Sequence, residues 1–223
     1  MKKTLLVLGL AGTMLIPTQR ALAIAGIGLN FGQDSYTIAK ATYTNLFEIP
    51  GVEFTRTEMD KPLGVGVYLF IDLIPVIDLD MGFNLFFNKF DVTYTNPVSG
   101  QSLSQEAAWA RTAAYLTVQR KLFKVPMFNV FAGGGLSFHA SVPLLDKEFM
   151  EGFLGDANAQ LNVEDLLDEV TQATGFHVEL GARFKPLFIP FALNVKFRRT
   201  FVDGIAPGES AFSTITLGFG FQL

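Results

Sequence analysis

The chain of 223 residues offers one pair of side chains whose types and spacing suit chemistry on a substrate, His139 and Ser141. A histidine close to a serine can accept the hydroxyl proton and make the oxygen a nucleophile for an ester. The alternative is that His139 pairs with His177 inside the protein. The absence of cysteine excludes a thiolate nucleophile, a disulfide framework and a thiolate metal site. No calcium-loop spacing is present, so we expect no cofactor and no metal ligands.

A second candidate site consists of charged side chains at alternate positions of otherwise apolar segments. An isolated charge in the interior of a narrow barrel is strongly disfavoured, so these residues are expected to pair. Such a set can serve as a gate or a catalytic cluster, or it can fill a lumen that has room for little else. Because the set contains both positive and negative charges, the favoured interpretation is that these side chains fill the lumen. The residues are Asp72, Asp80, Arg111, Lys121, Glu179, Arg183, Lys185, Lys196 and Arg198.

A third candidate is the acidic segment within residues 139–174. Asn162 is a plausible N-cap, and Leu166, Leu167 and Val170 follow at helical spacing, which predicts a short helix over residues 162–172. The simpler interpretation is a solvated helix over a barrel mouth. The functional one is a surface that holds divalent cations against lipopolysaccharide, or an adhesive epitope. Its acidic residues are Asp146, Glu148, Glu151, Asp156, Glu164, Asp165, Asp168 and Glu169.

The elements that must position these residues show a period of two. In residues 63–73 the odd positions are aliphatic, and in 79–87 Leu, Met and Phe alternate with Asp, Gly and Asn. Small and polar residues on the second face indicate a narrow lumen, because a soluble sandwich would favour Lys, Glu and Thr there. The same alternation, weakest in residues 108–122, predicts eight strands within residues 25–31, 63–73, 78–88, 108–122, 128–139, 176–185, 191–198 and 214–223.

The connections alternate in length, which is typical of an up-and-down outer-membrane barrel. Short, proline-containing links are predicted at residues 73–77, 123–127 and 186–190. Long links are predicted at residues 33–61, 92–105, 139–174 and 202–210. No uncharged apolar run after residue 23 approaches the roughly 18 residues of a spanning helix. The sequence therefore predicts an all-β protein, an eight-stranded antiparallel transmembrane β-barrel with a short helical extracellular loop.

The first 23 residues have the features of a cleaved export signal. Lys2 and Lys3 precede an apolar stretch, and Ala21-Leu22-Ala23 forms a cleavage site, which leaves residues 24–223 as one barrel domain. Without the three basic residues of this signal, 14 basic and 21 acidic residues give a net charge of −7. A chain this acidic has no basic stripe for phosphate backbones, so nucleic acid is excluded as a partner.

Residues 24–223 resemble the eight-stranded bacterial outer-membrane proteins, the group with the OmpA transmembrane domain, OmpX and OmpW. The resemblance implies a bacterial outer-membrane location, both termini in the periplasm, contact with lipid and lipopolysaccharide, and delivery by the barrel-assembly machinery. Members usually end in phenylalanine, whereas this chain ends in Leu223. We expect a non-enzymatic monomer with a structural or surface-interaction role.

Two alternatives follow from narrower resemblances. OmpW-like barrels imply a transporter for small apolar molecules, in which Phe70, Phe86 and Phe131 would line a pocket. His139-Ala140-Ser141 is similar to the site of outer-membrane lipid A deacylases, which implies an acyl hydrolase. That family's site lies on the lipid-facing exterior, whereas His139 has inward parity, so the resemblance is confined to three residues.

Overall fold

The computed structural model describes residues 25–45, 50–74, 77–96, 100–142, 170–186, 189–206 and 208–222. These residues form ten strands: β1 (Ala25–Asp34), β2 (Ala41–Thr44), β3 (Glu53–Arg56), β4 (Leu63–Ile74), β5 (Ile77–Asn96), β6 (Gln101–Val125), β7 (Phe128–Ser141), β8 (Thr171–Phe184), β9 (Phe191–Ala206) and β10 (Glu209–Gln222). No helix in these ranges is long and apolar enough to cross a membrane.

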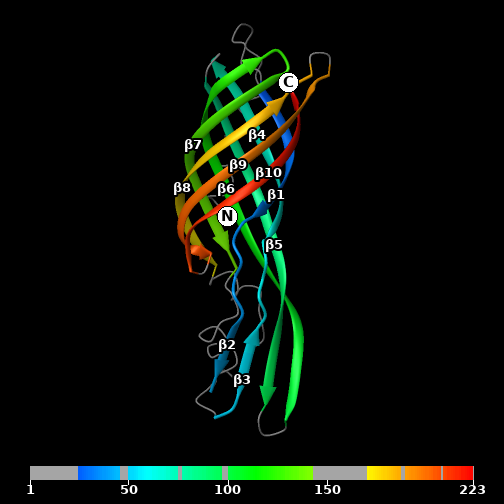
Figure 1. Ribbon diagram of the computed structural model, residues 1–223, viewed down its shortest axis with the longest axis vertical. Coiled ribbons are helices and arrows are strands. Elements are labelled where there is room, and N and C mark those ends of the chain that lie inside the picture. The colour runs from blue at the N-terminus through cyan, green and yellow to red at the C-terminus, as the bar shows by residue number, and fades with distance from the viewer. Residues whose placement is uncertain are drawn as a thin grey trace, which may run out of the picture.

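Eight of the strands close into a ring, as predicted. Strand β1 pairs with β4 on one side and with β10 on the other, and every neighbouring pair around the ring is antiparallel. The ladder then runs through β5, β6, β7, β8 and β9 without a crossover. Figure 1 shows these strands wound obliquely around a common axis. The eight-stranded up-and-down barrel is thereby confirmed.

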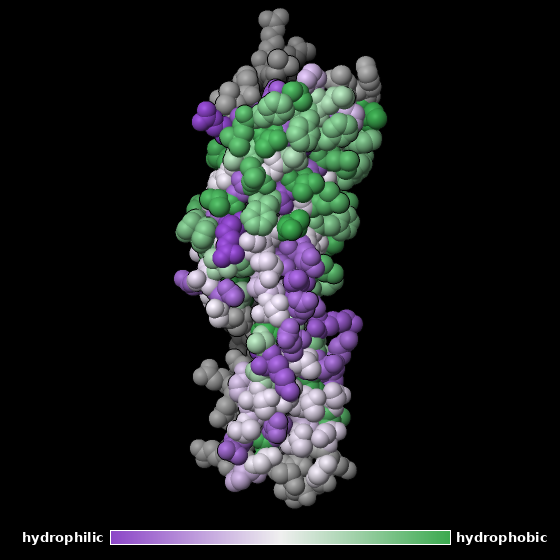
Figure 2. Space-filling model, in the orientation of Figure 1, coloured by the Kyte–Doolittle hydropathy of each residue, from purple (hydrophilic) through white to green (hydrophobic). Residues whose placement is uncertain are grey.

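Alternation along the strands sorts apolar side chains outward and polar ones inward. In β4 the side chains of Val65 and Val67 are exposed, whereas Tyr68 and Phe70 are buried. The parity of the weakest predicted strand is also confirmed, because Leu116 and Val118 face outward while Thr117 is fully buried. Figure 2 shows the result as a broad apolar belt over the barrel, with hydrophilic residues beyond it. A belt of this kind matches a hydrocarbon layer.

One end of the barrel has short turns, as predicted. The β6–β7 turn contains only Pro126 and Met127 between the two strands. Shortly before this turn the β6–β7 register shifts between Lys121 and Phe123, a bulge that leaves Leu122 unpaired. A bulge bends its strand and changes which way the following side chains point. Leu122 and Phe123 are both more than half exposed as a result.

Two of the predicted long links are strands. Residues 92–96 and 101–105 continue β5 and β6, whose pairing runs without a break to Asn96 and Gln101. Residues 202–210 likewise belong mostly to β9 and β10, which reach Ala206 and Glu209. Apolar alternation reports contact with lipid, so it ends where the hydrocarbon ends, although the backbone ladder continues into water. The predicted loop boundaries therefore mark the membrane edge and not the ends of the strands.

The predicted link at residues 33–61 also contains strands. Strands β2 and β3 form a hairpin, and β3 pairs with the outer part of β5. With residues 91–96 of β5 and 101–106 of β6 they make a four-stranded sheet, hereafter the extension sheet, which projects from one end of the barrel (Figure 1). Val52 and Phe54 are buried on one of its faces, packed against Tyr43, Val92 and Tyr94.

The acidic segment lies outside the described residues over 143–169. The helix predicted for 162–172 is wrong at its end, because Thr171 and Gln172 are the first residues of β8 and pair with Ser141 and Ala140. These two polar residues lack the apolar alternation that identifies a lipid-facing strand, so no strand could be predicted there.

Candidate functional site

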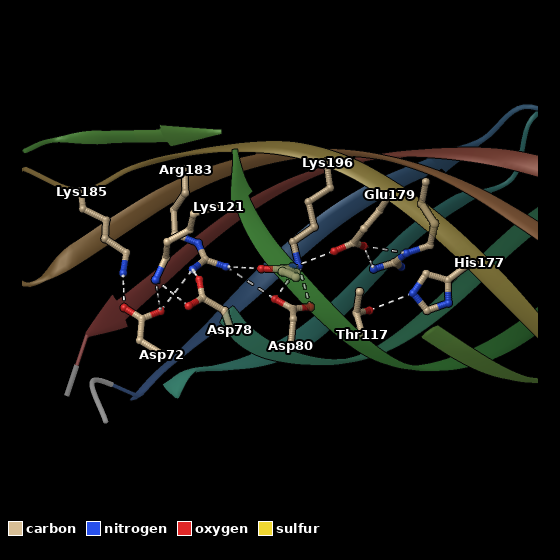
Figure 3. A network of polar contacts seen from close by, with 12 residues as sticks. Asp72, Asp78, Asp80, Thr117, Lys121, His177, Glu179, Arg183, Lys185 and Lys196 are labelled. Atoms are coloured by element: carbon tan, nitrogen blue, oxygen red, sulfur yellow. Dashed lines mark hydrogen bonds and ion pairs between the residues drawn. The ribbon is translucent and has the colours of Figure 1, made fainter. Parts of the chain in front are cut away.

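All nine charged residues predicted to face the lumen lie inside the barrel. Eight of them stand at alternate positions of five strands, and Lys185 follows β8 directly. At the short-turn end Lys121 Nζ lies 2.6 Å from Asp78 Oδ1, and Lys185 Nζ lies 3.3 Å from Asp72 Oδ2. Arg183 Nη1 lies 3.6 Å from Asp78 Oδ2. Figure 3 shows that these side chains come from different strands and converge on the two aspartates.

The network continues along the barrel axis. Lys196 Nζ donates to both carboxylate oxygens of Asp80 at 2.7 Å. Arg198 donates through Nε and Nη2 to Glu179 Oε2. Gln119 connects the layers, since it donates to Glu179 at 2.7 Å and accepts from Arg183 at 3.3 Å. A charge buried in this way is tolerated because its partners replace the water it has lost.

Arg111 anchors the other end of the network with a partner that the sequence analysis missed. Its Nη2 lies 2.5 Å from Asp34 Oδ2, and both side chains are fully buried. Thr214 donates to the second oxygen of Asp34 at 2.6 Å. Asp34 lies two inward positions beyond the predicted strand at residues 25–31, so extending the alternation would have found it. Asp78 has inward parity within the predicted strand at residues 78–88, but it was not included in the predicted charge set.

The lumen phenylalanines pack against these cations. Arg183 lies 4.3 Å from the ring centroid of Phe70 and 5.2 Å from that of Phe131, and Arg111 lies 4.4 Å from that of Phe86. Such contacts stabilise a desolvated cation by about 0.5–2 kcal/mol. The ring of Phe131 lies over Gly181 of the facing strand, where any Cβ would collide with it. The three rings are thus covered by arginines and by backbone.

A group of apolar residues closes the end of the lumen next to the extension sheet. Tyr36 packs edge-on against Trp109 and Phe212, with ring centroids 6.1 and 5.1 Å away. Burial raises the pKa of the Tyr36 hydroxyl. This outer-mouth cluster comprises Tyr36, Ile38, Met59, Phe90, Trp109, Val202, Ile205, Ala206 and Phe212. This cluster could not be predicted from the sequence because its members come from six separate segments.

The predicted contact between His139 and His177 is wrong. Arg111 donates to His139 Nδ1 at 2.7 Å, and His177 Nε2 lies 2.8 Å from Thr117 Oγ1. Tyr115 lies between the two imidazoles, edge-on to each. The register explains the difference, since His177 faces Gly135, four positions along β7 from His139. Barrel closure staggers the strands, so residues at similar distances from a loop lie at different heights.

The geometry suits structural filling better than turnover. His139 and Ser141 are both buried, and the imidazole is engaged by a cation, so the pair does not present a nucleophile to lipid or solvent. Within the part of the chain that the structure describes, no three His, Asp or Glu side chains are grouped as metal ligands. The eight residues of the predicted acidic site lie outside the described ranges.

Comparison with known proteins gives structural neighbours only. No family model and no curated protein matches the chain in sequence. Neisserial surface protein A matches with a TM-score of 0.51 and 9% identity over 89% of this chain and 99% of its own. Ail of Yersinia pestis, crystallised with the heparin analogue sucrose octasulfate, matches with a TM-score of 0.50 and 10% identity over 90% and 99%. The resemblance to eight-stranded outer-membrane barrels is therefore confirmed as one of architecture.

Proposed function

We propose that this chain is a non-enzymatic protein of the bacterial outer membrane that presents the extension sheet as an interaction surface. The apolar belt supports insertion in a bilayer, since each of the eight barrel strands carries exposed apolar residues that would have no other cover. Figure 2 shows this belt on one face of the barrel. The connections are short at one end of the barrel and long at the other. This difference supports an orientation with the short turns in the periplasm and the extension sheet outside the cell. Monomeric assembly by the barrel-assembly machinery, after removal of residues 1–23, belongs to the same proposal.

The observation that favours an interaction role is a face of hydroxyl groups on the extension sheet. Thr42, Thr55, Thr93 and Ser104 face one another in a single row across four strands. Thr42 and Thr55 lie 3.2 Å apart at their hydroxyl oxygens, and Thr93 and Ser104 lie 3.3 Å apart. This row lies on the extension sheet, which projects from one end of the barrel (Figure 1). It offers regularly spaced donors and acceptors to a polar partner such as lipopolysaccharide or a host glycan.

The transport alternative has less support. Phe70, Phe86 and Phe131, which would line an apolar pocket, are each covered by an arginine. The paired charges fill the axis, and the outer-mouth cluster closes one end. A small apolar molecule would have to displace buried ion pairs, each of which costs several kcal/mol to break.

A truncation of the extension tests this function. Replacing residues 93–104 with Asn-Gly should leave a barrel that shifts in mobility on boiling, because the pairs removed lie beyond the apolar belt. Cells that expose this variant should lose adherence to a host-cell monolayer, whereas cells with the full chain adhere. Full adherence by a correctly inserted truncation would contradict the proposal. N-terminal sequencing of the membrane form should begin at Ile24.

A further inference from the structure

The short-turn end of the barrel contains a cavity of about 150 Å³ between the β6–β7 turn and the base of β8. Three lysines line it, Lys121, Lys124 and Lys185, together with a single carboxylate, that of Asp72. Figure 3 shows Lys185 reaching toward Asp72, and Lys121 reaching toward Asp72 and Asp78. The cavity has room for about five water molecules, at roughly 30 Å³ each, which is enough for a phosphate group.

The cations at this end exceed the carboxylates. Asp72 is approached by Lys185 at 3.3 Å, by Lys121 at 3.7 Å and by Arg183 at 3.9 Å. Two further carboxylates of the described residues lie within reach of these cations: Asp78, near Lys121 and Arg183, and Asp80, near Arg183. Lys196 also pairs with Asp80, and Lys124 has no carboxylate partner among the ion pairs of the described residues, so the cations still outnumber the carboxylates. An excess of positive charge at one mouth of a strongly acidic chain favours an anion there.

The cavity also holds an unsatisfied polar group. The side-chain oxygen of Asn129 is buried in its wall and has no hydrogen-bond donor among the described residues. A buried acceptor of this kind usually has a partner from water or a ligand. A bound group with both a phosphate and a hydroxyl would satisfy the lysines and Asn129 together.

The rim of the cavity is apolar. Val125, Met127 and Phe128 line it and are themselves exposed, and Leu122 and Phe123 are exposed by the bulge in β6. Large apolar side chains beside lysines are typical of segments that sit among lipid headgroups. We infer that this cavity is a binding site for a phosphate group, carried by an anionic lipid of the inner leaflet or free in the periplasm. The inference rests on the proposed orientation of the barrel.

The test measures lipid retained by the full protein during native mass spectrometry from detergent. We expect one bound phosphatidylglycerol in preference to phosphatidylcholine. The double variant Lys124→Gln with Lys185→Gln should reduce this retention on the order of 25-fold, since each lysine near a headgroup contributes about fivefold. The matched control, Lys40→Gln with Lys89→Gln, removes two exposed lysines near the extension sheet and should retain phosphatidylglycerol like the parent.

Competition separates the two sources. Displacement of the lipid by millimolar inorganic phosphate would identify the free anion as the ligand, and resistance to it would identify the lipid. Equal retention of the two lipids by the parent, or unchanged retention in the double variant, would overturn the inference. Mobility shift on boiling is recorded for every variant, so failure to form the barrel, which would contradict the proposed function, is distinguished from failure to bind phosphate.

Discussion

The guanidinium of Arg111 has more partners than a single ion pair provides. Asp34 accepts from its guanidinium, His139 accepts from the other terminal nitrogen, and the rings of Phe86 and Phe212 lie on it at 4.4 and 4.8 Å. Because none of these groups reaches solvent, removal of one partner leaves a charge that water cannot stabilise. The pair joins β1 to β6, which lie three strands apart around the ring.

Asp34→Ala should therefore lower the free energy of unfolding by about 3–5 kcal/mol, the usual cost of leaving a buried charge without its partner. Urea unfolding in lipid vesicles, followed by the mobility shift, measures this cost. The double variant Asp34→Leu with Arg111→Met should lose much less, because it removes both charges. Equal losses in the two variants would show that the ion pair is not what Asp34 contributes.

An exposed pair provides the comparison. Lys89 and Glu106 lie 2.6 Å apart on the outer part of β5 and β6, and the carboxylate of Glu106 raises the pKa of Lys89. Both remain in water, where screening cancels most of the attraction. Lys89→Gln should leave the unfolding curve unchanged, and a shift as large as that of Asp34→Ala would contradict the distinction between buried and exposed pairs.

Side-chain parity can be tested at neighbouring positions of β4 and β5. Val67 is 46% exposed on the apolar belt, so Val67→Arg should cost about 2–4 kcal/mol on insertion near the middle of the bilayer. Asn84 is buried in the lumen, and its side-chain oxygen has no donor among the described residues, so Asn84→Ser should be nearly silent. Folding of Val67→Arg as efficient as that of the parent would argue against a lipid-facing position.

Inward and outward positions could be predicted from the sequence, because strand geometry fixes them locally. Val67 and Asn84 were placed correctly for that reason. Partners across the lumen could not be predicted in the same way. Which residue meets Arg111 or His139 depends on the stagger between strands, a property of the closed ring that no single segment records.

At the scale of elements, some strands end near the edge of the apolar belt, whereas others continue beyond it into water. The three short links were predicted from their prolines, and the eight spanning segments were predicted from their apolar alternation. The outer halves of β5 and β6 were not, because the row of residues that faces lipid nearer the barrel continues there as polar residues, among them Thr93, Thr95 and Ser104. Their pairing is nevertheless continuous with that of the barrel.

The acidic segment can be removed at a boundary that the structure now defines. Replacing residues 143–169 with a short Gly-Ser link should leave an inserted barrel, because β7 and β8 pair fully from Ser141 and Thr171 onward. Refolding in lipid micelles and the mobility shift on boiling measure this. We expect the variant to lose any cation-dependent binding that the parent shows. A variant that cannot fold would instead identify the segment as part of the lumen filling.

At the scale of the whole molecule, the lumen should not conduct ions. Paired charges occupy the axis from Asp72 to Arg111, and the outer-mouth cluster adds an apolar closure. In planar bilayers we expect no discrete current steps from protein whose insertion has been verified by protease protection. Reproducible steps would show that the network opens, and would favour the transport alternative over the surface role.

The ring closes between its first and last strands, where Gly26 faces Gln222. Each hairpin can form from neighbouring segments, but this seam must wait until the whole chain has been delivered. Until then β1 and β10 present bare backbone edges beside exposed Phe31, Phe219 and Phe221, which is a template for aggregation. The yield of folded barrel therefore depends on how long a chaperone protects the open intermediate, because ring closure competes with aggregation. Equilibrium stability does not decide the outcome of this kinetic competition.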